Sequence, residues 1–116
     1  FLRSWLSRDY TFREKVNLWR GKFYSKALLR DAMFATDLTE RLSGLDLPVY
    51  FCHGIHDYTC CYSEAKSFFA KLTAPLKGFY TFEQSAHSPM FEEPGKLLTI
   101  LREDVLRGAN SLADAT

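Results

Sequence analysis

The chain has 116 residues, of which 47% are hydrophobic and 25% are charged, and its formal net charge is +1. This balance is typical of a globular chain and excludes a disordered one. The near-neutral charge gives no reason to expect nucleic acid or an anionic membrane as a partner. No apolar run approaches the length of a membrane span.

The beginning of the sequence and its cysteines bear on processing and location. The chain starts Phe1-Leu2-Arg3-Ser4-Trp5, without an initiator Met or a signal-peptide pattern. We therefore expect it to have been cut or processed from a longer protein. Its cysteines are Cys52, Cys60 and Cys61, and the adjacent pair does not suit disulfide geometry. Reduced thiols in a cytoplasmic protein are the simplest interpretation.

Helical patterns fill the chain to about residue 44. Thr11 and Glu14 have the spacing of a capping box, in which each side chain bonds the other residue's backbone N–H. Apolar residues then recur every three or four positions and predict one apolar helix face; they are Phe12, Val16, Trp19 and Phe23. Gly21 is expected to weaken or end this helix. A second apolar pattern covers 27–34, and a short third helix ending at Gly44 follows.

After residue 45 the pattern changes from helical to extended. Val49–Cys52 is a short apolar run without polar alternation, which predicts a strand buried on both faces, as in a parallel sheet. Gly54 breaks this strand. Ser63 can then cap a helix that runs to about Leu72.

A second strand and helix complete the pattern. Phe79–Phe82 is the strand, and Pro94 suits the first turn of the helix. Leu97, Leu98, Leu101 and Val105 are expected to form the buried stripe of this helix. Gly108 is expected to stop it. Residues 109–116 are expected to form a flexible tail. The order predicts a βαβα unit with parallel strands. Because two parallel strands are not a stable sheet alone, this unit should be the edge of a larger sheet.

Asp57 and His87 are the candidate catalytic residues. Asp57 ends Gly54-Ile55-His56-Asp57, just past the first strand, and His87 lies just past the second. Active sites in open parallel sheets gather outside the carboxyl ends of the strands, so both side chains are expected at one edge. A carboxylate can fix the tautomer of an imidazole and stabilise the imidazolium. His87 is thus a candidate general base, and Asp57 is the candidate acid that orients it.

These residues also carry a family resemblance. Leu47-Pro48-Val49-Tyr50-Phe51 with Gly54-x-x-Asp57 resembles the penultimate core strand and acid turn of α/β-hydrolases. The run from Ser85 to Pro94, SAHSPMFEEP, resembles their histidine loop, especially in the lid-bearing branch that includes proline iminopeptidases. The order agrees with the family's Ser…Asp…His. The resemblance implies that a carboxylate oxygen of Asp57 lies about 2.6–3.2 Å from His87 Nδ1, or somewhat further without ligand. The resemblance implies an α/β fold with these parts: 1–44, end of the cap and linker; 45–108, C-terminal part of the hydrolase core; 109–116, tail.

The nucleophile of a triad is missing from the sequence. No Gly-x-Ser-x-Gly occurs, so the chain alone is expected to be inactive. The resemblance implies a serine-type hydrolase of small-molecule esters, amides or peptides that needs no cofactor. Its partner would be the missing N-terminal part of the same protein. Epoxide hydrolases or dehalogenases with a carboxylate nucleophile, and a non-catalytic binding member of the fold, are the alternatives.

Other residues near the pair have several interpretations. Tyr58, Met90 and Phe91 could line a substrate pocket, with cap or core packing as the alternative. His53-Gly54 could instead resemble the His-Gly oxyanion loop of the same family.

A second constellation consists of imidazole and thiol groups that could bind zinc: His53, His56, Cys60 and Cys61. Its spacing, His-x-x-His-x-x-x-Cys-Cys, is not a usual zinc pattern, and no metal site is predicted. An isolated chain would expose a sheet edge beside one of its strands. We therefore expect it to self-associate through that edge or to be poorly soluble.

Overall fold

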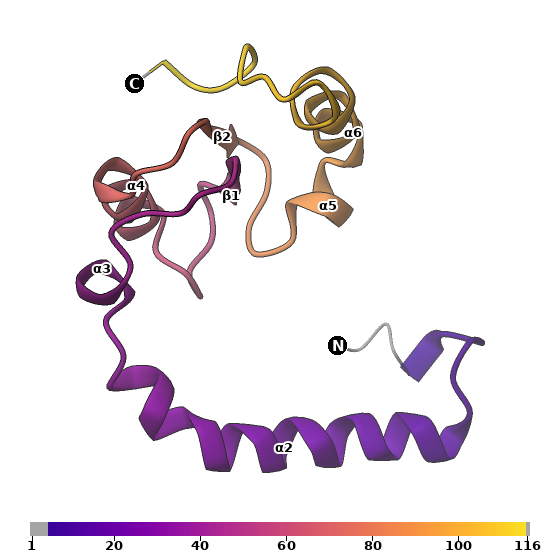
Figure 1. Ribbon diagram of the computed structural model, residues 1–116. Coiled ribbons are helices and arrows are strands. Elements are labelled where there is room, and N and C mark those ends of the chain that lie inside the picture. The colour runs from indigo at the N-terminus through magenta and orange to yellow at the C-terminus, as the bar shows by residue number, and fades with distance from the viewer. Residues whose placement is uncertain (1–4, 116) are drawn as a thin grey trace. The chain divides into compact units, whose positions relative to one another are not determined.

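The structure, a computed structural model, describes residues 5–115. Residues 1–4 of the predicted cap segment and Thr116 of the predicted tail lie outside the described residues. The chain divides into two compact units, one ending at Asp37 and the other beginning at Leu38. Each unit is described by itself, and Figure 1 shows the elements of both.

The boundary between the units lies earlier than the change of pattern at residue 45. Helix α3, Leu38–Arg41, and the chain after it belong to the second unit. The backbone N–H of Thr73 donates to the Ser43 carbonyl at 2.9 Å, and that of Leu45 donates to the Thr73 carbonyl at 2.8 Å. Through these bonds the segment around Ser43, which was predicted to belong to the linker, is attached to the second unit.

The first unit consists mainly of helix α2, Phe12–Phe34. The capping box is confirmed, because Thr11 accepts the Glu14 N–H at 3.3 Å while the Glu14 carboxylate accepts the Thr11 N–H at 2.7 Å. Gly21 was expected to weaken or end this helix, and it does not end it. The helix continues for 13 residues beyond it, since one glycine costs only about 1 kcal/mol relative to alanine. No residue of α2 is buried.

The second unit is a mixed α/β arrangement around a parallel two-stranded sheet. Strand β1, Val49–Gly54, pairs with β2, Lys77–Phe82, from Val49 opposite Lys77 to Gly54 opposite Phe82. Helix α4, Tyr62–Lys71, connects the strands, and α6, Pro94–Glu103, follows β2. Figure 1 shows α4 and α6 on opposite sides of the sheet. The predicted βαβα order is therefore confirmed.

Alternate residues of the strands pack on opposite faces. On the α4 side, the rings of Phe51 and Phe79 contact Phe69 with centroid distances of 5.4 Å. On the α6 side, the buried hydrophobic cluster consists of Tyr80, Phe82 and Ile100. Only Gly54 of β1 is fully buried, so the prediction of a strand buried on both faces does not hold in this chain. Its other residues are only half-buried, because among the described residues few contacts from the helices cover the two faces of β1.

The ends of the helices differ in detail from the predictions. Cys61 occupies the N-cap of α4, without a side-chain cap bond, and the Ser63 hydroxyl contacts the Cys61 sulfur instead. Pro94 does begin α6. The predicted buried stripe of this helix is wrong in part, because Leu98 and Leu101 are exposed and Ile100 is the residue of α6 that is buried. After α6 the chain forms a 3₁₀ turn, Val105–Arg107, and ends it at Gly108, whose φ of 61° favours glycine.

Residues 109–115 differ from the expectation of a flexible tail, because they are bonded to the sheet and to α6. The fully buried Asp104 carboxylate accepts the N–H groups of Ser111 and Leu112 at 3.0 and 2.9 Å. The N–H of Asp114 donates to the Phe79 carbonyl at 2.8 Å. This segment therefore contacts the edge of β2 that faces away from β1. Within residues 5–115, no helix combines the length and apolar character that a membrane crossing requires.

Candidate active site

The turn after β1 holds the acid. The N–H of Asp57 donates to the Gly54 carbonyl at 3.2 Å and closes the turn. The Oδ1 atom of Asp57 accepts the backbone N–H groups of Thr59 and Cys60 at 2.8 and 3.0 Å. A short polar side chain that bonds the backbone two or three residues ahead is typical of such turns. These bonds fix the carboxylate through Oδ1, so that its other oxygen, Oδ2, can accept a bond from a different residue.

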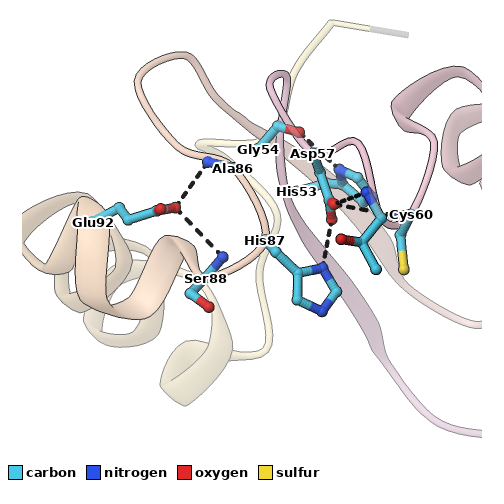
Figure 2. A network of polar contacts seen from close by, with 9 residues as sticks. His53, Gly54, Asp57, Cys60, Ala86, His87, Ser88 and Glu92 are labelled. Atoms are coloured by element: carbon cyan, nitrogen blue, oxygen red, sulfur yellow. Dashed lines mark hydrogen bonds and ion pairs between the residues drawn. The ribbon is translucent and has the colours of Figure 1, made fainter. Parts of the chain in front are cut away.

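The loop after β2 brings the histidine to this carboxylate. His87 Nδ1 lies 2.8 Å from Asp57 Oδ2, which confirms the predicted distance. The Asp57 side chain is 6% exposed and that of His87 is 59% exposed. Figure 2 shows the second ring nitrogen of His87 pointing away from Asp57. The pair thus combines a buried acid with an accessible imidazole.

Close contact between the two loops depends on Gly54. A Cβ atom at this position would lie 2.2 Å from the Ser85 carbonyl oxygen and 2.3 Å from that of Ala86. The backbone N–H of His56 also donates to the Ser85 carbonyl at 3.1 Å. The absence of a side chain therefore lets the histidine loop lie directly on the acid turn. This packing explains the glycine of the Gly-x-x-Asp pattern.

The electrostatics keep Asp57 ionised. Burial by itself raises the pKa of Asp57, but hydrogen bonds from the Cys60 N–H, the His87 side chain and the Thr59 N–H outweigh it and lower that pKa to about 2. At neutral pH the group is a carboxylate, which only accepts hydrogen bonds. The Nδ1 atom of His87 must then carry the proton between them. In the neutral imidazole, Nε2 is left as the acceptor.

The arrangement can perform one half of a triad's chemistry. An Nε2 acceptor can take a proton from a nucleophile, and the fixed carboxylate stabilises the imidazolium that results. Both groups follow the carboxyl ends of neighbouring parallel strands, which is the usual place for a site in an open sheet.

The other predicted site residues are exposed and follow Asp57 or His87 closely in the sequence. Tyr58 follows Asp57 and is 99% exposed, and Met90 and Phe91 are exposed on the short helix α5, Pro89–Glu92. A surface hollow of about 570 Å³ lies elsewhere, between α4, β2 and the C-terminal segment, with Lys66 and Phe79 in its lining. Substrate binding by Tyr58, Met90 and Phe91 stays a prediction.

Within the described residues, the imidazoles and thiols that were considered as metal ligands do not form one cluster. His53 stacks on the Phe79 ring, and its Nδ1 lies 3.1 Å from the Gly54 carbonyl. Cys60 instead groups with Asp57 and His87, whose ligand atoms lie within 4.8 Å of one another. Both Asp57 oxygens already accept hydrogen bonds from neighbours. A metal bound through His87 Nδ1 would displace one of these bonds.

Two glutamates of the histidine loop were missed by the sequence reasoning. The Glu92 carboxylate accepts the Ala86 N–H at 2.8 Å, and the Glu93 carboxylate accepts the Ser85 hydroxyl at 2.5 Å. Both residues lie within the run that resembles the family's histidine loop. Their position just before Pro94 is a signal, although acidic residues there are usually read as ordinary residues of a helix start.

Comparison with known proteins gives one partial relation. The chain is 30% identical over 86 residues to a protein of Bacillus subtilis (strain 168) named "Probable aminopeptidase YbaC", a hydrolase-type name. The match covers 74% of this chain and 27% of that protein, so the chain spans about a quarter of the relative's length. No family model matches the chain. No solved structure matches it either.

Proposed function

We propose that the chain supplies the acid and the histidine of an α/β-hydrolase that cleaves amide, peptide or ester bonds. The observation that carries this proposal is the 2.8 Å contact between Asp57 Oδ2 and His87 Nδ1 at the ends of adjacent parallel strands. The likeness to a protein named an aminopeptidase supports the peptide-bond class. A proline iminopeptidase-like activity is the narrowest form of the proposal.

The roles of the two residues follow from their geometry. A nucleophile on sequence outside these 116 residues attacks the carbonyl carbon of the substrate, and His87 Nε2 takes its proton. His87 then returns the proton to the leaving group. Asp57 holds Nδ1–H and stabilises the imidazolium, and it forms no bond to substrate. A serine is the nucleophile that the resemblance favours.

The test uses the full-length natural polypeptide that carries this chain. We expect it to hydrolyse aminoacyl anilides or aryl esters, and His87→Ala to lower kcat by at least about 10³-fold. His56→Ala is the matched control, since His56 is an exposed imidazole in the acid turn whose backbone N–H makes its bond to the loop. It should retain activity.

A fluorophosphonate probe separates the nucleophiles. Labelling of the polypeptide indicates a serine nucleophile. Turnover of an epoxide or a haloalkane without labelling, with an alkyl ester on the nucleophilic carboxylate that accumulates in His87→Ala, indicates a carboxylate nucleophile. Neither labelling nor turnover on any of these substrates would overturn the proposal in favour of a non-catalytic binding module.

A further inference from the structure

Glu92 holds the backbone on both sides of His87. Its Oε2 atom accepts the N–H of Ala86 at 2.8 Å and that of Ser88 at 3.4 Å. Figure 2 shows this carboxylate between the two donors, with His87 in the segment that joins them. One side chain therefore restrains the residues before and after the imidazole.

Glu93 holds the preceding part of the same loop. Its Oε2 atom accepts the Ser85 hydroxyl at 2.5 Å and the Gln84 N–H at 3.1 Å. Ser85 is fully buried, and its carbonyl accepts the N–H of His56 in the acid turn. Through Ser85, the Glu93 carboxylate is connected to the turn that carries Asp57.

The orientation of Glu93 is unusual for its place in the chain. It occupies the N-cap of α6, a ten-residue helix, but its side chain makes no cap bond to that helix. A carboxylate at a helix N-terminus is normally stabilised by the helix's own N–H groups. Here it accepts donors of the histidine loop instead. The loop thus receives charge-assisted bonds, which are shorter and stronger than neutral ones.

We propose that Glu92 and Glu93 are positioning residues that hold the loop over 84–88, so that His87 Nδ1 stays bonded to Asp57. This inference rests on the proposed hydrolase function for its effect on rate. Reacting groups must be held within about 0.5 Å of their productive geometry, and a 1 Å misplacement can cost about 10²-fold in rate. The two carboxylates act through His87 and do not touch substrate.

The test compares alanine with glutamine at both positions. Glu92→Ala and Glu93→Ala remove the acceptors, and we expect kcat of the full-length polypeptide to fall about 10- to 100-fold with KM changed less than about threefold. Glu92→Gln and Glu93→Gln keep a side-chain oxygen acceptor and should restore most of kcat. The matched control is Glu83→Ala, which removes an exposed carboxylate beside the same loop and should leave kcat unchanged.

A second measurement does not depend on turnover. In the ¹⁵N-labelled full-length polypeptide, the Nδ1 proton of His87 should give an exchange-protected signal because it is bonded to Asp57. We expect the signal in the wild type, in both glutamine variants and in Glu83→Ala, and its loss by exchange in the alanine variants. A persistent signal or wild-type kcat in both alanine variants would overturn the inference.

The possible failures are distinguishable. If the wild type has no turnover, the proposed function fails, and the Nδ1 signal still decides whether the glutamates hold the loop. If Glu93→Ala does not fold, Ser85→Ala replaces it, since it removes only the hydroxyl donor to Glu93. If Glu92→Ala does not fold, Glu92→Asp replaces it, because the shorter side chain draws the carboxylate back from the Ala86 and Ser88 N–H groups. A several-fold loss of kcat at an unchanged melting temperature then supports the inference, and an unchanged kcat contradicts it.

Discussion

Gly54→Ala should separate the two loops that hold the candidate pair. The added Cβ would lie 2.2 Å from the Ser85 carbonyl oxygen and 2.3 Å from that of Ala86, whereas Cβ atoms essentially never approach other heavy atoms closer than 3.0 Å. At least one loop must therefore move by about 1 Å. Overpacking of this kind costs about 1–3 kcal/mol of unfolding free energy, and the same shift at the pair can cost about 10²-fold in kcat.

Three measurements on the full-length polypeptide test Gly54→Ala. Urea denaturation reports the unfolding free energy, the Nδ1 proton signal reports the bond between His87 and Asp57, and kcat reports the effect on rate. Gly95→Ala is the control in the same unit. Gly95 lies inside α6, and a Cβ atom added there meets no atom within 4 Å. The substitution should leave stability unchanged or raise it by up to about 1 kcal/mol. A Gly54→Ala variant with wild-type stability and an intact signal would refute the reasoning about loop contact.

Three further predictions concern stability and association. Asp104→Ala leaves the Tyr80 hydroxyl and two N–H groups without their acceptor and should cost at least about 2 kcal/mol in urea denaturation; an unchanged midpoint would contradict this. The pKa of Asp57 is lowered from 3.8 to about 2. Ionised Asp57 therefore stabilises the fold by about 2–3 kcal/mol above about pH 4, and this stabilisation is lost as the pH falls toward 2. Asp57→Asn should show a smaller loss of stability over that range, and an identical acid curve would exclude the carboxylate. Sedimentation of the isolated chain should show self-association through β1, and a monomer at high concentration would count against that edge.

Much of the second unit was predictable because its signals are local. The apolar runs at 49–52 and 79–82 lie between turn residues, and both form strands. The predicted end of the helix at Gly21 was wrong because helix propensity is a weak signal and the residues around Gly21 keep a helical pattern. The prediction of a flexible tail differs from the structure at 109–115 for another reason. The anchor of this segment, Asp104, is a buried carboxylate at the end of α6, and a charged residue there is normally expected to face solvent.

The candidate pair was predictable from topology, whereas its supports were not. Parallel strands place their carboxyl ends at one edge, which brings the loops that carry Asp57 and His87 to the same edge of the sheet. The bonds from Glu92 and Glu93 depend on where the loop folds back over the start of α6. A close approach such as that of Gly54 to Ser85 is likewise a tertiary contact, and the sequence marks it only by the glycine.

The most direct test of the catalytic pair is kcat of Asp57→Asn in the full-length polypeptide, measured beside its thermal melt. Asparagine keeps the shape but favours the wrong tautomer of His87, and in serine proteases the equivalent change costs about 10⁴-fold in kcat. The account predicts a loss of several orders of magnitude in kcat, a small change in KM and a folded protein at neutral pH. Near wild-type turnover would contradict it and remove Asp57 from the proposed triad.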